Sequence, residues 1–534
     1  MTRRILIPVL ALALVAPGLG AQQQQKNALP TSDEADVFSN AFRAIERMHM
    51  DAPSDSSLLA GAIQGMIKSL NDPYAEVYTS NEAKAFDEET TGNYSGIGLT
   101  IQLLNNRVTV TAVFRKAPAE DAGIQLGDQI VGVNGHDASS WSTSTAADSI
   151  KGPVGTSVQV TIQRPGYDEP FTFDIKRDSV HVPAVSQGVI DGNIGYVILD
   201  RVARNSAREM NDALDSLKSN HGLIIDLRGN PGGFLDESLM LADLFLKPGS
   251  TLASTTQRIP GGTKNQVTTE SYQGRLPARV PNLPVVILVD RFTASGAEIF
   301  AGALQDYDRA LILGERSFGK GVMQTVMPLP HGQKLRFTTG TWQTPLGRSL
   351  HRPRGLDGQP LPEDLDTFPK VKTPGGRILQ GGGGVFPDLP IKADTLTLAE
   401  RALLKTAVEA QFPLSQRISE FSVSVAKSLL ANGSKAALDQ DRFDQWVSEM
   451  ESDGLPSEAV EAPGVREYLA WQVRMRIAQR MEEIGQEAEF RMERDPVLTE
   501  AVKLLESAKT QSQLFAEANQ VRNKENVQAQ NGAG

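Results

Sequence analysis

Two short segments of the sequence carry side chains that could take part in chemistry. Ser295 follows an apolar run at 285–290 and precedes helix-forming residues, so we expect it at a turn from a buried strand into a helix. Such a turn exposes a hydroxyl and points the positive end of the helix dipole at it. Lys320 lies between Gly319 and Gly321, 25 residues further on. The sequence thus offers one candidate nucleophile and, separately, a lysine on a glycine-flanked loop.

Each segment also has a plainer interpretation that the sequence leaves open. A serine before a helix is commonly its N-cap, and a lysine between two glycines can be a solvated turn residue. Gly314, Gly319 and Lys320 also have the spacing of a phosphate-binding loop. Gly321 then stands where that loop needs a Ser or Thr for magnesium, and a β-like run follows instead of a helix. We therefore predict no nucleotide binding.

A glycine-rich turn is a further candidate element of such a site. The sequence Asn230-Pro231-Gly232-Gly233 follows a strand-like run at 223–227. Such glycines could form a plain turn, or they could offer backbone N–H groups to an oxyanion. The chain has no cysteine, and none of its six histidines lies in a recognisable motif or at a short metal-ligand spacing. Thiol catalysis and Cys-zinc sites are therefore excluded, and neither a Ser-His-Asp triad nor a His-rich metal site is predicted.

A β-rich stretch at 93–178 contains a pattern that resembles a PDZ domain. The matching residues are Pro118-Ala119, Ala122-Gly123, Gly127-Asp128 and Val133-Asn134-Gly135. Upstream lies a loop that resembles the PDZ carboxylate-binding loop: Gly96, Ile97, Gly98 and Leu99. Free N–H groups in a Gly-flanked turn can hold a terminal carboxylate, and an exposed strand edge can pair with an extended peptide. We therefore expect this loop to bind the C-terminus of a substrate.

The elements that must position these residues follow from the hydrophobic periodicity. Residues 190–345 alternate strand-like and helix-like runs, which predicts an α/β layered core. The expected core strands are 194–199, 223–227, 285–289 and 310–313, and the expected helices are 207–218, 236–245 and 297–305. Helices are also expected within 33–90 and from about 396 onwards. An apolar residue at every fourth position from Val465 to Met481 predicts a packed bundle or an oligomer arm.

Together these segments resemble the carboxy-terminal processing (tail-specific) peptidase family of secreted serine proteases, over roughly residues 35–392. The matching motifs are Asn230-Pro231-Gly232-Gly233, Ala294-Ser295-Gly296-Ala297-Glu298, Gly319-Lys320-Gly321 and Gln324. The resemblance implies an α/β fold with a crotonase-like (ClpP/crotonase) layered protease core. A mostly β PDZ domain would be inserted, and the N- and C-terminal regions would be helical. Gly296 departs from the Ala common in the family, and residues 356–372 look like an insertion.

The resemblance also implies roles for individual residues. Ser295 would be the nucleophile, Lys320 its general base, and Gln324 would orient the lysine. The oxyanion would be held by the N–H of Gly296 and by that of Gly232 or Gly233. Free lysine titrates near about 10.4, so a lysine base needs a pKa lowered by burial.

Two alternatives stay open beside this assignment. Asp306 is cast as a supporting acid in some members of the family, and the other interpretation of it is a helix-end charge pair. A catalytically silent PDZ-containing binding or scaffold protein of the same fold is the alternative to an enzyme.

The chain is expected to divide into a signal peptide and four further regions. These are 1–21 (signal peptide), 30–91 (N-terminal helices), 92–178 (PDZ domain), 180–393 (protease core) and 396–534 (C-terminal helical extension with a disordered end). Arg3 and Arg4 precede an apolar run at 5–19, which is typical of an export signal. Cleavage is expected near Gly20 or Ala21, and an uncleaved anchor is the rival. The mature protein would be periplasmic or otherwise extracytoplasmic.

The composition narrows the class of partner. The 534 residues include 53 Lys and Arg against 64 Asp and Glu, and the formal net charge of −11 does not suggest a nucleic-acid binder. Hydrophobic residues make up 40%, as in ordinary globular proteins. We expect no cofactor and no nucleotide. The expected partners are unfolded or tail-exposed protein substrates, and an adaptor and homo-oligomers through the helical N- or C-terminal regions stay open.

Overall fold

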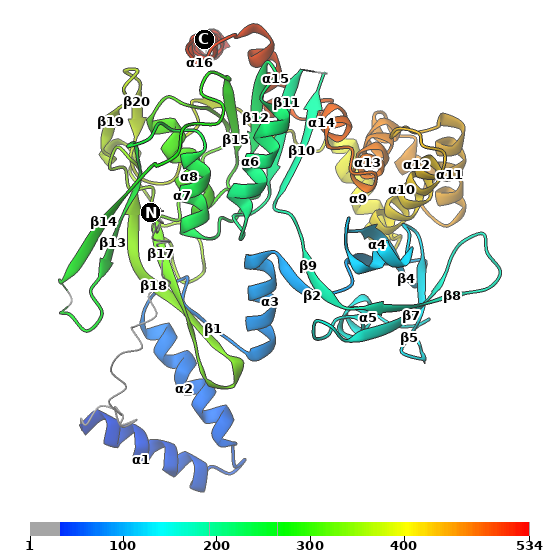
Figure 1. Ribbon diagram of the computed structural model, residues 1–534, viewed down its shortest axis with the longest axis horizontal. Helices are drawn as coiled ribbons and strands as arrows, with labels where there is room; N and C mark the ends of the chain where they lie inside the picture. The colour runs from blue at the N-terminus through cyan, green and yellow to red at the C-terminus, as the bar shows by residue number, and fades with distance from the viewer. Residues whose placement is uncertain (1–32, 192, 264, 533–534) are drawn as a thin grey trace, which may run out of the picture. The chain divides into compact units, whose positions relative to one another are not determined.

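The computed structural model describes residues 33–191, 193–263 and 265–532 (Figure 1). The predicted signal peptide lies outside the described residues. The chain divides into two compact units between Asp72 and Pro73. The first unit contains helices α1 (Asp33–Met48) and α2 (Asp55–Ser69), neither of which has a buried residue. Ser54 caps α2 by accepting a hydrogen bond from Ser57 N at 3.2 Å.

The second unit is built around a six-stranded sheet. In spatial order its strands are β10 (Val185–Ile190), β11 (Ile194–Leu199), β12 (Gly222–Asp226), β15 (Val285–Val289), β16 (Leu311–Gly314) and β21 (Leu389–Pro390). The strands from β11 to β21 run parallel, and β10 is antiparallel at one edge. Every residue of β12, β15 and β16 is buried. Burial on both faces explains why these strands appear in the sequence as continuous apolar runs.

Two different sets of helices cover the two faces of this sheet. One face packs against α6 (Ser206–Leu217), α7 (Leu235–Asp243) and α8 (Gly296–Asp306). The other packs against α14 (Ile484–Met492), α15 (Pro496–Ser507) and α16 (Gln511–Gly532), which come from the end of the chain. In β12 the side chains of Leu223 and Ile225 face the first set, and that of Ile224 faces the second. The C-terminal helices therefore complete the layered α/β core.

A second sheet lies next to the α8 side of the core. It has the order β1 (Glu76–Tyr78), β18 (Lys334–Gln343), β13 (Thr251–Arg258) and β14 (Val267–Gln273), and β17 (Val322–Pro328) also pairs with β18. Strand β1 falls where the sequence analysis expected only helices. Its three residues form a strand because they pair with β18, more than 250 positions away along the chain. The remaining short elements of this region are η1 (Pro330–Gly332), η2 (Leu365–Thr367), β19 (Lys370–Lys372) and β20 (Ile378–Gln380).

A β-rich domain is inserted between α3 (Ser80–Thr91) and β10. Its sheet has the order β3 (Leu99–Leu104), β4 (Arg107–Val113), β5 (Gln129–Val133), β7 (Ser157–Gln163) and β8 (Phe171–Lys176), with β6 (His136–Asp137) beside β5. Helices α4 (Pro118–Ala122) and α5 (Thr143–Ile150) complete it. Strands β2 (Asn93–Gly96) and β9 (Asp178–His181) pair with each other. This pairing brings the two ends of the domain together, as an insertion requires.

The C-terminal extension begins as a helical bundle. Its helices are α9 (Leu398–Glu409), α10 (Leu414–Ala431), α11 (Gln440–Ser452), α12 (Ser457–Val460) and α13 (Val465–Arg480). The every-fourth stripe from Val465 to Met481 is buried in the bundle core. The bundle also contacts the β-rich domain, since Asn105 N donates to Glu420 Oε1 at 2.6 Å. The stripe therefore packs within the chain, as one of the two predicted alternatives requires.

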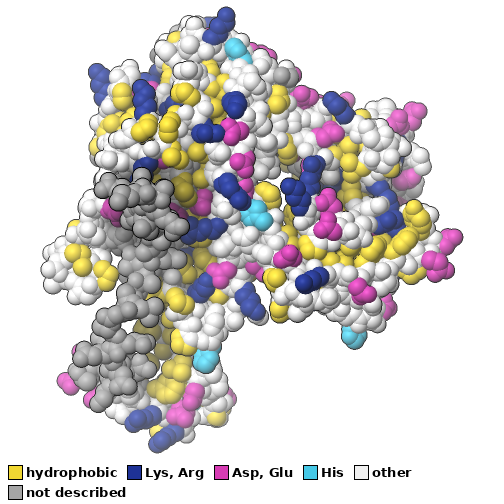
Figure 2. Space-filling model, viewed as in Figure 1, with side chains coloured by type: hydrophobic (Ala, Val, Ile, Leu, Met, Phe, Trp, Pro, Cys, Tyr) yellow, Lys and Arg dark blue, Asp and Glu magenta, His cyan; other side chains and the backbone are white. Residues whose placement is uncertain are grey.

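The remaining features of the chain are its last helix, the absence of membrane-spanning helices among the described residues and the surface charge. Helix α16 spans Gln511–Gly532, and the expected disordered end of the extension stays a prediction. That segment contains no proline and few β-branched residues, so it can continue a helix. None of the helices among the described residues has the length and apolar character to cross a membrane. Figure 2 shows acidic and basic side chains interspersed over the visible face.

Candidate active site

Ser295 lies at the turn from β15 into α8, where the sequence placed it. Its backbone has a φ of 51° and a ψ of −115°, a region that non-glycine residues rarely adopt. Neighbouring contacts hold the turn, because Ala294 N donates to Asn230 O at 2.9 Å. The side chain of Ser295 is only partly buried. The fold thus maintains a strained turn that presents a hydroxyl at the N-terminus of a buried helix.

The backbones on either side of the candidate dyad meet at one buried carboxylate. Glu298 Oε2 accepts hydrogen bonds from Ser295 N and from Lys320 N, each at 2.8 Å. These two nitrogens therefore lie within twice that distance of each other. Glu298 Oε1 accepts from Gly319 N at 2.7 Å and from the Ser317 hydroxyl at 2.5 Å. One side chain thus fixes both the serine turn and the lysine loop.

Burial and hydrogen bonding shift the pKa of Glu298 in opposite directions. Its side chain is fully buried. Burial raises the pKa of the Glu298 carboxyl above its usual value, and the four hydrogen bonds offset part of that rise. Three of the donors are backbone N–H groups, which cannot act as acceptors for a carboxylic acid proton. The bonding pattern therefore fits a carboxylate that accepts four hydrogen bonds.

Lys320 and Gln324 are joined through their side chains. Lys320 Nζ donates to Gln324 Oε1 at 2.6 Å, and Gln324 Nε2 donates to Tyr74 O at 2.8 Å. Lys320 Nζ also lies 5.0 Å from the centre of the Tyr74 ring. The Tyr74 carbonyl fixes which end of the Gln324 amide faces the lysine. Gln324 lies at a register shift in the pairing of β17 with β18.

The candidate oxyanion glycines come together beside Ser295. A Cβ placed on Gly232 would lie 2.6 Å from Gly296 N and 2.8 Å from Ser295 Cβ, and one placed on Gly296 would lie 3.1 Å from Gly233 N. Gly232 N donates to Asn230 Oδ1 at 2.8 Å, so its N–H is already used. Within the described part of the chain, no hydrogen bond is formed by the N–H of Gly233 or of Gly296. Of the two alternatives, this geometry favours Gly233.

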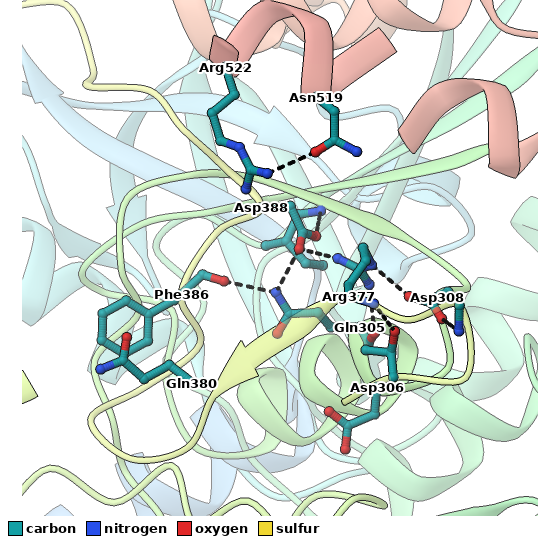
Figure 3. Close-up of polar contacts among 12 residues, drawn as sticks. Gln305, Asp306, Asp308, Arg377, Gln380, Phe386, Asp388, Asn519 and Arg522 are labelled. Carbon is teal, nitrogen blue, oxygen red and sulfur yellow. Dashed lines mark hydrogen bonds and ion pairs between the residues drawn. The ribbon is translucent and has the colours of Figure 1, made fainter. Parts of the chain in front are cut away.

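Asp306 lies at the other end of α8 and is bound to an arginine. Arg348 Nε donates to Asp306 Oδ1 at 2.8 Å, and Leu346 N donates to Asp306 Oδ2 at 2.8 Å. Both charged side chains are buried. Figure 3 shows the Asp306 carboxylate directed away from a neighbouring cluster in which Arg377 bridges Asp308 and Asp388. Asp306 thus forms a buried charge pair with Arg348 at the end of α8.

Comparison with known proteins places this geometry in a family. Residues 193–357 match the model of peptidase family S41, residues 87–163 match that of the PDZ domain, and residues 16–83 match that of the activating protease CtpB N-terminal domain. The carboxy-terminal processing protease CtpA of Bacillus subtilis (strain 168) is 33% identical over 363 residues, which are 68% of this chain and 76% of that protein. This chain belongs to the carboxy-terminal processing proteases of peptidase family S41. It is a serine-type peptidase with a PDZ domain.

A second curated relative agrees with this membership. The carboxy-terminal-processing protease of Bartonella bacilliformis is 34% identical over 336 residues, which are 61% of this chain and 75% of that protein. Among solved structures, the photosystem II D1 C-terminal processing protease is 28% identical, with a TM-score of 0.34, and the match covers 60% of this chain and 91% of that one. The membership supports the protease interpretation over a silent scaffold.

The PDZ domain of this S41 peptidase contains the loop expected to bind a carboxylate. Gly96 ends β2 and Leu99 begins β3, which is the edge strand of the PDZ sheet. Ile97 is buried in the domain core. Gly98 has a φ of 86°, and a Cβ there would lie 2.2 Å from Ala117 Cβ. The four predicted residues therefore form one tight turn at the start of an edge strand.

Sequence reasoning missed the two residues that organise this protease site. Glu298 appeared in the sequence analysis only as part of a motif, and Tyr74 did not appear in it. A signal for Glu298 was present, because Ser295 and Glu298 have the spacing of a capping box. Tyr74 carries no comparable signal. Its contact with Gln324 joins segments 250 positions apart.

We predict that Glu298→Gln lowers kcat/KM strongly and lowers stability only modestly. The amide would place an NH2 group against N–H donors that the carboxylate now accepts, and a lost buried acceptor costs about 1–3 kcal/mol. The positions of Ser295 and Lys320 would then no longer be tied to one group. The measurement is peptide hydrolysis together with thermal unfolding. Glu363→Gln is the matched control, since Glu363 is a buried carboxylate that binds Arg316. Equal activity of the Glu298→Gln protein and the wild type would contradict the assignment.

Proposed function

We propose that this S41 peptidase hydrolyses peptide bonds with Ser295 as nucleophile and Lys320 as general base. The observation that carries the proposal is the shared carboxylate of Glu298, which accepts from both Ser295 N and Lys320 N at 2.8 Å. The hydrogen bond from Lys320 Nζ to Gln324 Oε1 supports a role for Gln324 in orienting the base.

In the proposed mechanism the neutral amine of Lys320 takes the proton of the Ser295 hydroxyl. The serine oxygen bonds to the scissile carbonyl carbon, and the carbonyl electron pair moves to oxygen. Collapse of this intermediate breaks the C–N bond, and the lysine ammonium returns the proton to the leaving amine. Water, deprotonated by the same lysine, then attacks the acyl-serine ester. As the ester C–O bond breaks, the lysine ammonium returns its proton to the Ser295 oxygen, which releases the acid product and regenerates the enzyme.

The oxyanion of each intermediate would be held by the N–H groups of Gly296 and Gly233. Both donors are uncommitted within the described residues, and both lie at the N-terminal end of α8 beside Ser295. Removing one such donor typically lowers the rate by about 10²–10³-fold.

We assign Asp306 a structural role, because its carboxylate is hydrogen-bonded by Arg348 and by Leu346 N.

The substrates we propose are unfolded chains and flexible C-terminal tails of proteins. A PDZ domain matches residues 87–163, and its Gly-flanked turn at the start of an edge strand suits a terminal carboxylate followed by an extended chain. Binding a tail there would raise its effective concentration near the nucleophile. Two relatives bear the name carboxy-terminal processing protease, which is in line with this substrate class.

The proposal extends to the domain bounds, the type of core and the cellular location. We propose a crotonase-like core at 180–393, a PDZ domain at 92–178, helical regions at 30–91 and 396–534, and an exported protein whose signal at 1–21 is cleaved near Gly20 or Ala21.

Helices α1 and α2 expose apolar side chains, including Val37, Phe38 and Met66, and a helical unit without a buried residue favours self-association. An adaptor remains a second proposed partner.

We predict that Ser295→Ala and Lys320→Ala each lower kcat/KM by roughly 10³-fold or more while the protein stays folded. The double variant should be no worse than either single one, because the two residues act as a unit. Hydrolysis of an unfolded protein, followed by mass spectrometry of the products, measures the effect. Lys405→Ala is the control, since Lys405 is an exposed lysine of α9. Substantial cleavage by Lys320→Ala at neutral pH would disprove the dyad.

We also predict that peptides with an amidated C-terminus are cleaved several-fold more slowly than the same peptides with a free acid. Amidation removes the negative charge and one acceptor that the loop at 96–99 would bind, so the change should fall mainly on KM. Steady-state kinetics on matched peptide pairs measures it. Equal kcat/KM for the two forms would show that the PDZ domain does not recognise the carboxylate.

A further inference from the structure

The C-terminal extension reaches the catalytic core through close contact between a helix and a strand. Helix α14 crosses β10 where Gly485 of the helix meets Gly188 of the strand. A Cβ on Gly188 would lie 2.3 Å from Gly485 N, and one on Gly485 would lie 2.4 Å from Val189 O. The absence of side chains lets the two backbones touch. The next helix, α15, packs on β11 and β12 of the same sheet.

Asp495 is the N-cap of α15, and its two carboxylate oxygens have different partners. Oδ1 caps the helix by accepting hydrogen bonds from Val497 N at 3.1 Å and Leu498 N at 3.0 Å. Oδ2 lies 2.6 Å from Nη1 of Arg228. The side chains of Asp495 and Arg228 are only 11% and 18% exposed, so this ion pair is weakly screened by solvent.

Arg228 is held by a second carboxylate on its other edge. Its Nε and Nη2 donate to Asp226 Oδ1 and Oδ2 at 2.9 and 2.7 Å, a two-pronged pair. Asp226 also accepts from the Tyr196 hydroxyl at 2.7 Å. Burial would raise the pKa of Asp226, but the charge and hydrogen bonds of Arg228 bring that pKa below its usual value. The guanidinium therefore sits between one carboxylate of the core and one of the extension.

Arg228 begins the loop that leads to the candidate oxyanion glycine. Gly229 N donates to Asp290 Oδ1 at 3.0 Å. Asn230, which is fully buried, donates from Nδ2 to Leu199 O at 2.8 Å and accepts from Gly232 N at 2.8 Å. The loop from Arg228 to Gly233 is thus tied to the strands of the sheet on one side. The ion pair with Asp495 connects the loop to the extension, and Arg491 of α14 also lies 4.0 Å from Asp226.

We propose that Asp495 is a positioning residue for catalysis, which fixes Arg228 and through it the loop that carries Gly233. The C-terminal extension would then be part of the active enzyme and not an accessory arm. This inference rests on the proposed oxyanion role of Gly233. It assigns a catalytic requirement to a segment that lies outside the matched family models, which end at residue 357.

The test uses the full-length protein with Asp495→Asn. Asparagine is as good an N-cap as aspartate, so the cap on α15 is kept, whereas an amide cannot neutralise Arg228. Asp495→Ser, another capping residue, provides a second variant. We expect kcat on a short free-acid peptide to fall roughly tenfold, because small misplacements of oxyanion donors are costly, with KM within about twofold of wild type.

The matched control is Glu400→Gln. Glu400 is a buried carboxylate that binds Arg494, the residue before Asp495, and glutamine can keep its place in the capping box of α9. This variant also loses an ion pair of the extension, but one that does not touch Arg228. Its kcat should stay within about twofold of wild type. Thermal unfolding of all variants separates a loss of stability from a loss of turnover.

Two results would overturn the inference. One is an unchanged kcat in both Asp495 variants, and the other is an equal loss of kcat in Glu400→Gln. Neither would affect the proposed nucleophile, because that assignment is tested separately by Ser295→Ala in the same assay. A fully active Ser295→Ala protein would reject the proposed function itself.

Discussion

The arrangement of the site depends on one buried carboxylate. Glu298 accepts four hydrogen bonds, two of them from the backbones of the candidate nucleophile and base. A buried charge is tolerated only when its hydrogen-bonding capacity is filled. The strained turn at Ser295 and the glycine-flanked loop at Lys320 supply those donors, so the carboxylate and the two loops stabilise one another. This mutual dependence places a serine from one strand and a lysine from the next at a common centre.

The second requirement is that the catalytic sheet be covered on both faces. Helices α6, α7 and α8 cover one, and α14, α15 and α16 cover the other. A parallel sheet exposed on one side would leave apolar side chains such as Ile224, Val286 and Leu288 in water. The end of the chain is thus part of the protease core in packing terms. Its ion pair with Arg228 links that packing to the loop beside Ser295.

Much of the fold was predictable because it is encoded in local patterns. Strands β11 and β15 begin and end where their apolar runs do, and Ser295 lies at the expected turn from strand to helix. Strand β1 was missed because only its pairing with distant β18 makes it a strand. Tyr74 and Asp495 were missed for the same reason, since Tyr74 contacts Gln324 and Asp495 contacts Arg228, each from more than 200 positions away. The choice of Gly233 over Gly232 in the proposed oxyanion hole needed the actual hydrogen bonds, because both glycines fit the sequence equally.

The central claim is that Lys320 acts as the neutral base for Ser295, and the pH dependence of kcat/KM tests it most directly. Free lysine titrates near about 10.4, so a lysine that is the base at neutral pH must lose its proton well below that value. We predict an acid limb with a midpoint well below 10.4 and a plateau on its alkaline side. A kcat/KM that still rises steeply between about pH 9 and 11 would contradict the claim, because it would mean that the lysine titrates as it does in water.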